Sequence, residues 1–418
     1  MGLKNLFLKK DGLTIATYYM VYSFCLGYRT FEIINGIMIH PLEVFIYGSL
    51  IRIILTKPKK YNDIPFAITT ISILFVAYFS VDVLTRFNIY IINEFKNVII
   101  IYLIFYLFQY IDVSNEYLKN IFRKYIFSAS IIALLGIFEN YFPIIIAGIF
   151  GHGVNPMNTS GDILFQRLMF LFWGSPLGAN LIPPVFPMLL FLRMKDDQNF
   201  KGFFLITSLV LINLTAIYLS GNRISWLNLT LMVIIMLFQF RSNLFPNIKI
   251  YMLSILLGFI LYIYSQPVEG RYLSMFKVMT GQIDHKYDSS SMNRLQKAQT
   301  AIASIKANPM GTGWSSQGWI HNDLLQIAST TGLPNAIIFF LSLFYLLWRL
   351  IKKIRLKNAS DYTFYFVGLN IILYIVISFF LNGNLLLVQT GVPLIMLWSI
   401  IISHMDHIEK NKIKSLTI

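Results

Sequence analysis

Apolar residues form long blocks along the whole chain, and polar residues are confined to short stretches between them. A run of about 17 to 25 apolar residues is long enough for a helix to cross the hydrocarbon layer of a bilayer. The runs predict twelve spans, near residues 12–30, 35–55, 64–84, 97–111, 125–147, 177–193, 202–219, 224–240, 250–266, 324–348, 362–380 and 385–404. The predicted fold is therefore an all-α polytopic membrane bundle, with residues 1–418 forming a single integral-membrane domain.

Two places in this pattern need a further decision. The segment 141–176 contains FPIIIAGIF and LFQRLMFLFW, which are too apolar for a freely solvated loop, so a re-entrant or interfacial piece is an alternative there. The predicted number of spans is therefore uncertain by about one helical hairpin, that is, one pair of spans. The first apolar run has no clear small-residue cleavage site, so we expect a retained helix and not a removed signal peptide.

The composition agrees with a membrane protein and excludes several kinds of functional site. Of the 418 residues, 56% are hydrophobic and 13% are charged, and the mean hydropathy of +0.64 is far above that of an ordinary water-soluble domain. The single cysteine, Cys25, excludes an internal disulfide and a cysteine metal cluster. No nucleotide-binding glycine loop and no His/Cys/carboxylate cluster at metal spacing is found in the sequence, so neither a cofactor nor a metal is expected.

The distribution of basic residues predicts the orientation of the chain. With both termini in the cytoplasm, the inner segments carry 23 Lys and Arg residues and the outer segments carry 11. This asymmetry is what the positive-inside rule requires, and it explains most of the net charge of +15 without a nucleic-acid partner. Few charges lie in the middle of the predicted spans, which argues against an ion-coupled transporter.

The longest polar segment, 267–323, is a predicted outer loop that holds six of the eleven outer basic residues. Long loops cross the membrane regardless of charge, but binding of an anionic ligand is the alternative explanation. Within this loop the segment 291–309 predicts a helix that ends before Pro309 and lies on the membrane surface or on the bundle. Its expected apolar face consists of Leu295, Ala298, Ile302 and Ile305.

A short outer turn, SGNRISWL at 220–227, places Arg223 at the start of a predicted helix. The dipole of a helix disfavours a cation at this end, so helix formation alone does not account for the arginine. A guanidinium beside free N–H groups at a helix start can bind phosphate oxygens in a forked geometry. A snorkelling interfacial arginine explains the position equally well.

A second outer stretch contains NPMGTGW at 308–314 and a histidine, His321, just before a long apolar helix. The glycines and Pro309 predict a constrained turn, and Asn322 and Asp323 are suited to cap the helix. A neutral imidazole at this boundary can accept a proton from a sugar hydroxyl. A lone interfacial histidine is more often a structural polar residue, so its neighbours have to decide its role.

Those neighbours resemble the signature motifs of the bacterial O-antigen ligase and O-antigen polymerase superfamily. One motif pairs Arg223 with Leu227 after three residues, and the other places His321 ten intervening residues before Gly332. The stretch at 308–314 is similar to the asparagine-proline-x-glycine-x-glycine stretch of the family. The order of these motifs and their shared predicted outer face make chance agreement improbable.

The resemblance extends over residues 160–340, which form an expected O-antigen ligase-like core. Arg294 stands about where the family carries an arginine upstream of the glycine-rich stretch. Arg167, followed by FWGSPLGAN at 172–180, resembles the earlier arginine and glycine-x-proline turn of the family, but Leu177 stands where asparagine is common. This departure puts the role of Arg167 in doubt.

The resemblance implies a metal-independent, inverting glycosyl transfer at the periplasmic face of the bacterial inner membrane. The donor would be a glycan on undecaprenyl diphosphate, and the acceptor a growing glycan or lipid A core, with a chain-length regulator as a possible further partner. Arg223 and Arg294 are the first candidates for binding the diphosphate, and Arg167 and Arg271 are weaker ones. His321 is the candidate base, and Glu139 is a rival.

Three alternatives stay open from the sequence. A polymerase, a ligase and a protein O-glycosylating relative differ in their acceptor and share the donor chemistry, so the motifs do not separate them. A flippase or exporter of the same lipid-linked glycan would also require outer arginines, but it would not require a base. Asp323 is expected either to orient His321 or to cap the following helix, and it is assigned no proton transfer.

Overall fold

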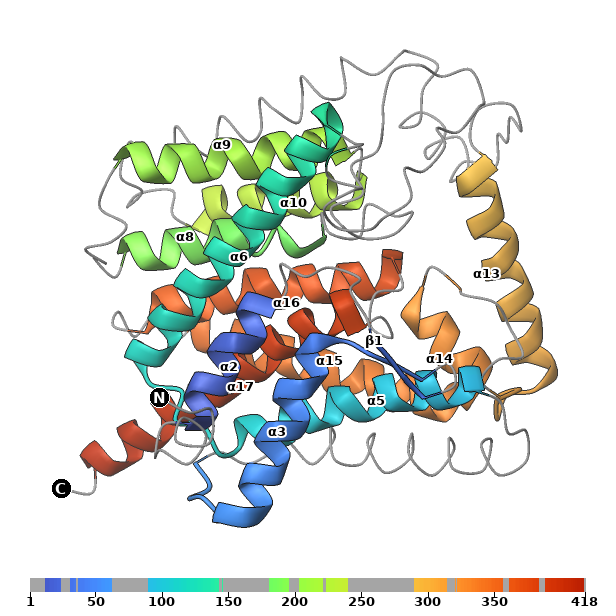
Figure 1. The fold of residues 1–418 in the computed structure, drawn as a ribbon, viewed down its shortest axis with the longest axis horizontal. Coiled ribbons are helices and arrows are strands. Elements are labelled where there is room, and N and C mark those ends of the chain that lie inside the picture. Colours follow the sequence, from blue (N-terminus) through green and yellow to red (C-terminus); the bar gives the residue numbers. More distant parts are fainter. Residues whose placement is uncertain are drawn as a thin grey trace.

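The computed structural model describes residues 12–23, 31–34, 37–61, 89–142, 145, 180–194, 203–220, 223–239, 289–313, 320, 322–355, 361–382 and 388–416. Within these ranges the chain is a bundle of helices with one small β-hairpin (Figure 1). The elements are α2 (Gly12–Ser23), β1 (Phe31–Ile34), β2 (Ile37–Ile39), α3 (Pro41–Thr56), α5 (Ile89–Phe108), α6 (Asn115–Tyr141), α8 (Val185–Met194), α9 (Phe203–Ser220), α10 (Arg223–Gln239), α13 (Ser289–Ala307), α14 (Asp323–Thr331), α15 (Leu333–Arg355), α16 (Tyr362–Asn382) and α17 (Val388–Leu416).

Four of the described helices contain segments long and apolar enough to cross a membrane: Asn115–Phe138, Leu333–Lys352, Thr363–Leu381 and Gly391–Asn411. Shorter apolar helices accompany them at Ile99–Phe108, Val185–Met194, Phe204–Tyr218 and Ser225–Ile234. The chain is thus a helical membrane protein, as the hydropathy pattern predicted. The predicted spans 64–84 and 250–266, and nearly all of the segment 141–176, lie outside the described residues, so twelve spans stays a prediction.

The β-hairpin is a departure from the predicted all-α fold. Strands β1 and β2 pair antiparallel, with Phe31 opposite Ile39, and the helix that follows them, α3, begins at Pro41 and not at residue 35 as predicted. A capping box fixes this start, since Nδ1 of His40 accepts from the Leu42 N–H and the Glu43 carboxylate accepts from the His40 N–H, each at 3.1 Å. Ile and Phe suit a strand as well as an apolar helix, so hydropathy alone did not separate the two.

Other helix boundaries also differ from the prediction. The expected single span 324–348 consists of two helices, α14 and α15, separated at Gly332. Helices α5 and α6 begin earlier than expected, and α17 continues to Leu416, well beyond the expected end at residue 404. These extensions contain polar residues, which a search for apolar runs excludes although they continue the helix.

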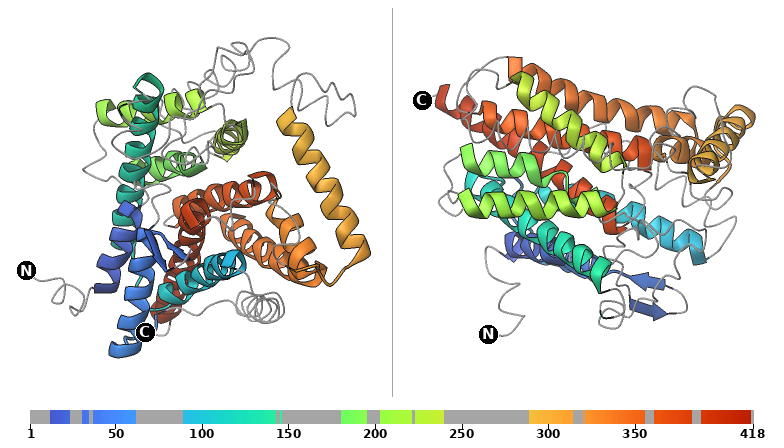
Figure 2. Two further views of the ribbon diagram at one scale, coloured as in Figure 1. Left: turned by 45° about the vertical axis from the view of Figure 1, so that its right-hand side comes forward. Right: turned by 90° about the horizontal axis from the view of Figure 1, so that it is seen from above.

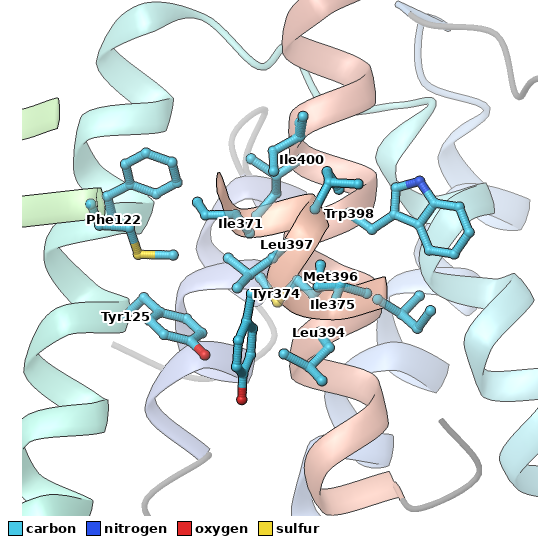
Figure 3. Close-up of a cluster of buried hydrophobic side chains, with 14 of the residues drawn as sticks. Phe122, Tyr125, Ile371, Tyr374, Ile375, Leu394, Met396, Leu397, Trp398 and Ile400 are labelled. Atoms are coloured by element: carbon cyan, nitrogen blue, oxygen red, sulfur yellow. The ribbon is translucent and has the colours of Figure 1, made fainter. Parts of the chain in front are cut away.

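Helix α16 is central to the described bundle, because it packs against α8, α10, α14, α15 and α17. Its buried residues Ile371, Tyr374 and Ile375 face an apolar cluster that includes Trp398 from α17 and Phe122 from α6 (Figure 3). The apolar cluster is therefore what holds α6, α16 and α17 together.

Two tyrosine hydroxyls lie at the edge of this cluster and bind the backbone that precedes α8. The Tyr125 hydroxyl donates to the Leu181 carbonyl at 3.0 Å, and the Tyr374 hydroxyl donates to the Asn180 carbonyl. Both rings come from the apolar cluster with their oxygens on the same side (Figure 3). A buried carbonyl without a partner would be costly, so these bonds fix the position of residues 180 and 181.

The two ends of the bundle differ in character. The β-hairpin, α13, α14 and the start of α10 lie at one end, and the C-terminal end of α17 lies at the other (Figures 1 and 2). At the α17 end, Arg349 of α15 forms ion pairs with Asp406 at 3.3 Å and Glu409 at 3.2 Å. His407 lies 2.9 Å from Asp112 at the same end, so α17 is bound there to α15 and to the turn after α5.

Replacing Arg349 with Met is expected to lower the free energy of unfolding by about 1–2 kcal/mol, since two half-buried carboxylates lose their common cation. Thermal unfolding of the purified protein in detergent measures this change. Lys352→Met is the matched control, because Lys352 is exposed on the same helix, and its melting temperature should stay at the wild-type value. Equal melting temperatures for both variants would contradict a stabilising role for these ion pairs.

Candidate functional site

Of the five predicted site residues, two lie within the described residues. Arg223 is the first residue of α10, as expected, and Arg294 is an exposed residue of α13. His321, Arg167 and Arg271 lie outside the described residues. The starts of α10 and α14 nevertheless lie at one end of the bundle, with α13 beside α14 (Figure 1).

The backbone on both sides of His321 is held by defined hydrogen bonds. The N–H of Ile320 donates to Oε1 of Gln326 at 2.7 Å, and Oδ1 of Asn322 accepts from the Leu325 N–H at 2.9 Å. Asn322 is thus the N-cap of α14, while Asp323 is the first residue of the helix and is buried. Asp323 was expected either to orient His321 or to cap the helix, and the structure assigns the cap to Asn322.

The glycine of the histidine motif packs directly against the glycine-rich stretch. Gly311 and Gly332 adopt positive φ values of +93° and +102°, which residues with a side chain rarely adopt. A Cβ on Gly311 would overlap the Thr330 carbonyl and lie 2.7 Å from the Gly332 nitrogen, and a Cβ on Gly332 would lie 2.8 Å from the Met310 carbonyl oxygen. Each glycine is therefore required both by its backbone conformation and by the proximity of the other.

Backbone hydrogen bonds complete this contact. The N–H groups of Thr312 and Gly313 donate to the carbonyls of Ser329 and Thr330 at 2.9 and 3.0 Å. The N–H of Leu333 donates to the Pro309 carbonyl at 2.8 Å. The stretch 308–313 thus satisfies carbonyls in the last turn of α14 that have no partner within the helix, and it defines the point at which α14 ends and α15 begins.

Helix α13, which carries Arg294, packs on α14. It ends at Ala307, before Pro309, as the sequence predicted. Ala301 is its fully buried residue, whereas Ile302, which was expected on the apolar face, is 44% exposed. The other three residues of the expected apolar face, Leu295, Ala298 and Ile305, are partly buried, and the placement of this face on the membrane surface or on the bundle stays a prediction.

The end of the third motif lies beside the start of α10. Asn180, the last residue of the stretch 172–180, is buried, and its Oδ1 accepts from the Ser225 hydroxyl at 3.5 Å. Its carbonyl accepts from Tyr374, which sequence analysis did not select because a tyrosine in an apolar span gives no functional signal. Two segments with family-like motifs thus meet where Asn180 binds Ser225, which lies two residues after Arg223 on α10.

The described residues were searched for a metal-binding group. No group of three or more His, Cys, Asp and Glu side chains that could hold a metal is found within the described ranges. The arrangement around α10, α13 and α14 combines helix starts, two arginines and constrained glycines. Helix starts and guanidinium groups are suited to binding an anion at the membrane surface.

These features define a helical membrane protein with a glycine-locked pair of helices at one end. Residues 208–340 match the family model described as O-antigen ligase, and this match confirms the predicted resemblance to the O-antigen ligase and polymerase superfamily. The match includes Arg223, Arg271, Arg294 and His321, whereas Arg167 lies before it. It supports glycosyl transfer in surface-polysaccharide synthesis as the general activity. Comparison with curated proteins gave no match.

Gly311→Ala is expected to destabilise the α13–α14 region by about 1–3 kcal/mol, because it forces a side chain into the left-handed region against backbone atoms. The glycan-transfer activity of this variant should also fall. Gly368→Ala is the matched control, because a Cβ there meets only the side chains of Ile401 at 3.3 Å and Leu350 at 3.5 Å. Hydrogen exchange of α14 measures the local stability, and unchanged protection in Gly311→Ala would refute the proposed lock.

Proposed function

We propose that this protein transfers a glycan from undecaprenyl diphosphate to an acceptor sugar at the periplasmic face of the bacterial inner membrane. The observation that carries the proposal is the O-antigen ligase match over residues 208–340, together with the contact between Gly311 and Gly332 that joins two family-like motifs. Twelve spans with both termini in the cytoplasm would put the starts of α10 and α14 on the periplasmic side.

The proposed reaction is a single displacement with inversion at the donor sugar. The acceptor hydroxyl oxygen attacks the anomeric carbon, the bond from that carbon to the diphosphate oxygen breaks, and undecaprenyl diphosphate leaves. His321 accepts the hydroxyl proton, which makes the attacking oxygen a stronger nucleophile. Arg223 and Arg294 stabilise the negative charge that develops on the leaving diphosphate, and Arg167 and Arg271 are weaker candidates for the same role.

The described backbone supports these roles. Arg223 begins α10, where free N–H groups of the first turn add to the attraction for phosphate. Ile320 and Asn322, the two residues next to His321 in the chain, are both hydrogen-bonded to α14. A metal is not needed in this scheme, because the diphosphate is already a good leaving group and the arginines supply positive charge.

Arg223→Ala and His321→Ala are each expected to reduce transfer by at least about 100-fold, the typical contribution of one charge-stabilising group or one general base. Membrane insertion and yield should stay at the wild-type level. Lys306→Ala is the control, since Lys306 is an exposed cation on α13 and has no proposed role. Normal glycan attachment in both site variants would refute the assignment, and loss of activity in Arg223→Ala alone would favour a flippase.

Deletion of the gene separates the possible acceptors. Loss of a polymerase leaves surface polysaccharide with a single repeat unit, whereas loss of a ligase leaves long chains on undecaprenyl diphosphate. Electrophoresis of the surface polysaccharide and of the lipid-linked fraction measures both products. Unchanged polysaccharide in the deletion strain would contradict each of these functions.

A further inference from the structure

The first turn of α10, which begins with Arg223, is attached to a segment from elsewhere in the chain. Ser225 lies two residues after Arg223 in the same turn. Its hydroxyl donates to Oδ1 of Asn180 at 3.5 Å, and both residues are buried. The N–H groups of a first helical turn have no partners within the helix, so contacts made from outside the helix help to determine where that turn lies.

Asn180 can anchor this turn only if its own backbone is held, and Tyr374 of α16 holds it. The Tyr374 hydroxyl donates to the Asn180 carbonyl. This carbonyl lies in the same rigid peptide plane as the Cα atom of Asn180, from which the amide side chain extends. Two hydrogen bonds in series therefore connect the middle of α16 to the first turn of α10. The two helices also pack against each other.

Tyr125 of α6 makes a bond of the same kind one residue later and provides a comparison. Its hydroxyl donates to the Leu181 carbonyl at 3.0 Å, and its ring is buried beside that of Tyr374 (Figure 3). The Leu181 carbonyl belongs to the next peptide plane, which does not contain the Cα atom of Asn180. Satisfying a buried carbonyl explains both hydroxyls equally well. Only the bond of Tyr374 acts directly on the residue that contacts α10.

The position of this first turn matters because of the role proposed for Arg223. Ser225 is two residues from Arg223, which is about 3 Å along the helix axis, so a shift of one moves the backbone of the other. Arg223 is proposed to stabilise the charge that develops on the leaving diphosphate. A displacement of about 1 Å of such a group can slow a reaction by roughly 100-fold, because the stabilisation depends on its geometry in the transition state.

We propose that Tyr374 is a positioning residue for the glycan transfer. Its hydroxyl, through Asn180 and Ser225, holds the start of α10 and with it the backbone of Arg223. This inference rests on the proposed function and adds to it a residue that touches neither donor nor acceptor. Tyr374 lies outside residues 208–340, the range of the family match, so the match gives it no role.

The test measures steady-state transfer by the full chain in detergent, with lipid-linked donor and acceptor isolated from a strain that lacks the gene. Tyr374→Phe removes the hydroxyl and keeps the ring. Its kcat should fall about tenfold while the KM for the donor changes by less than about twofold, because charge stabilisation is lost in the transition state. Tyr125→Phe is the matched control. Both variants should have lower melting temperatures, but the kcat of Tyr125→Phe should equal that of the wild type.

Double variants show whether the effect passes through Ser225 and Arg223. Ser225→Ala alone should also lower kcat about tenfold. The double variant Tyr374→Phe/Ser225→Ala should be no slower than the slower of its two single variants, because both changes break the same connection. In an Arg223→Ala background, Tyr374→Phe should cause no further loss of kcat, since the group that it positions is absent.

Several results would overturn the positioning role. A wild-type kcat in Tyr374→Phe, or equal losses of kcat in Tyr374→Phe and Tyr125→Phe, would show that the hydroxyl only stabilises the fold. Losses that multiply in the double variant would show that Tyr374 and Ser225 act independently. If these results occur while Arg223→Ala still abolishes transfer, the positioning role alone is wrong. If Arg223→Ala transfers glycan at the wild-type rate, the role proposed for Arg223 is wrong and the positioning role fails with it.

Discussion

The close approach of Gly311 to Gly332 is the contact on which the candidate site depends. A membrane protein can interrupt a helix only where other groups satisfy the backbone that is released. Here the stretch 308–313 supplies donors for the last carbonyls of α14, and the absence of side chains at both glycines permits the backbones to meet. The point at which α14 ends and α15 begins follows from this packing constraint.

A second constraint connects this region to the rest of the bundle. Helix α16 packs on both α14 and α10, and Tyr374 from its middle binds the backbone of Asn180 beside Ser225. The segments that carry the family-like motifs are therefore arranged around one helix that has no motif of its own. Apolar packing of α16 with α6 and α17 stabilises the bundle. Buried hydrogen bonds such as that of Tyr374 determine which segments lie next to α16.

Much of the architecture could be predicted from the order of apolar and polar residues. Helices were expected wherever long apolar runs occur, and most described helices overlap those runs, with Arg223 and Asn322 at the expected starts. Helices α5, α6 and α17 extend beyond the runs through polar residues. The break at Gly332 was missed, because the runs on both sides of a single glycine are apolar and continuous. The hairpin before His40 was missed because isoleucine and phenylalanine suit a strand as well as a membrane helix.

The sequence by itself determined that the chain is a helical membrane protein and which motifs suggest a glycan transferase, since both follow from residue type and spacing. Only the tertiary structure decided that Gly311 and Gly332 pack against the same turn and that Asn180 meets Ser225. These facts depend on contacts between residues far apart in the chain. Hydropathy and spacing describe one segment at a time, so they carry no information about which segments come together.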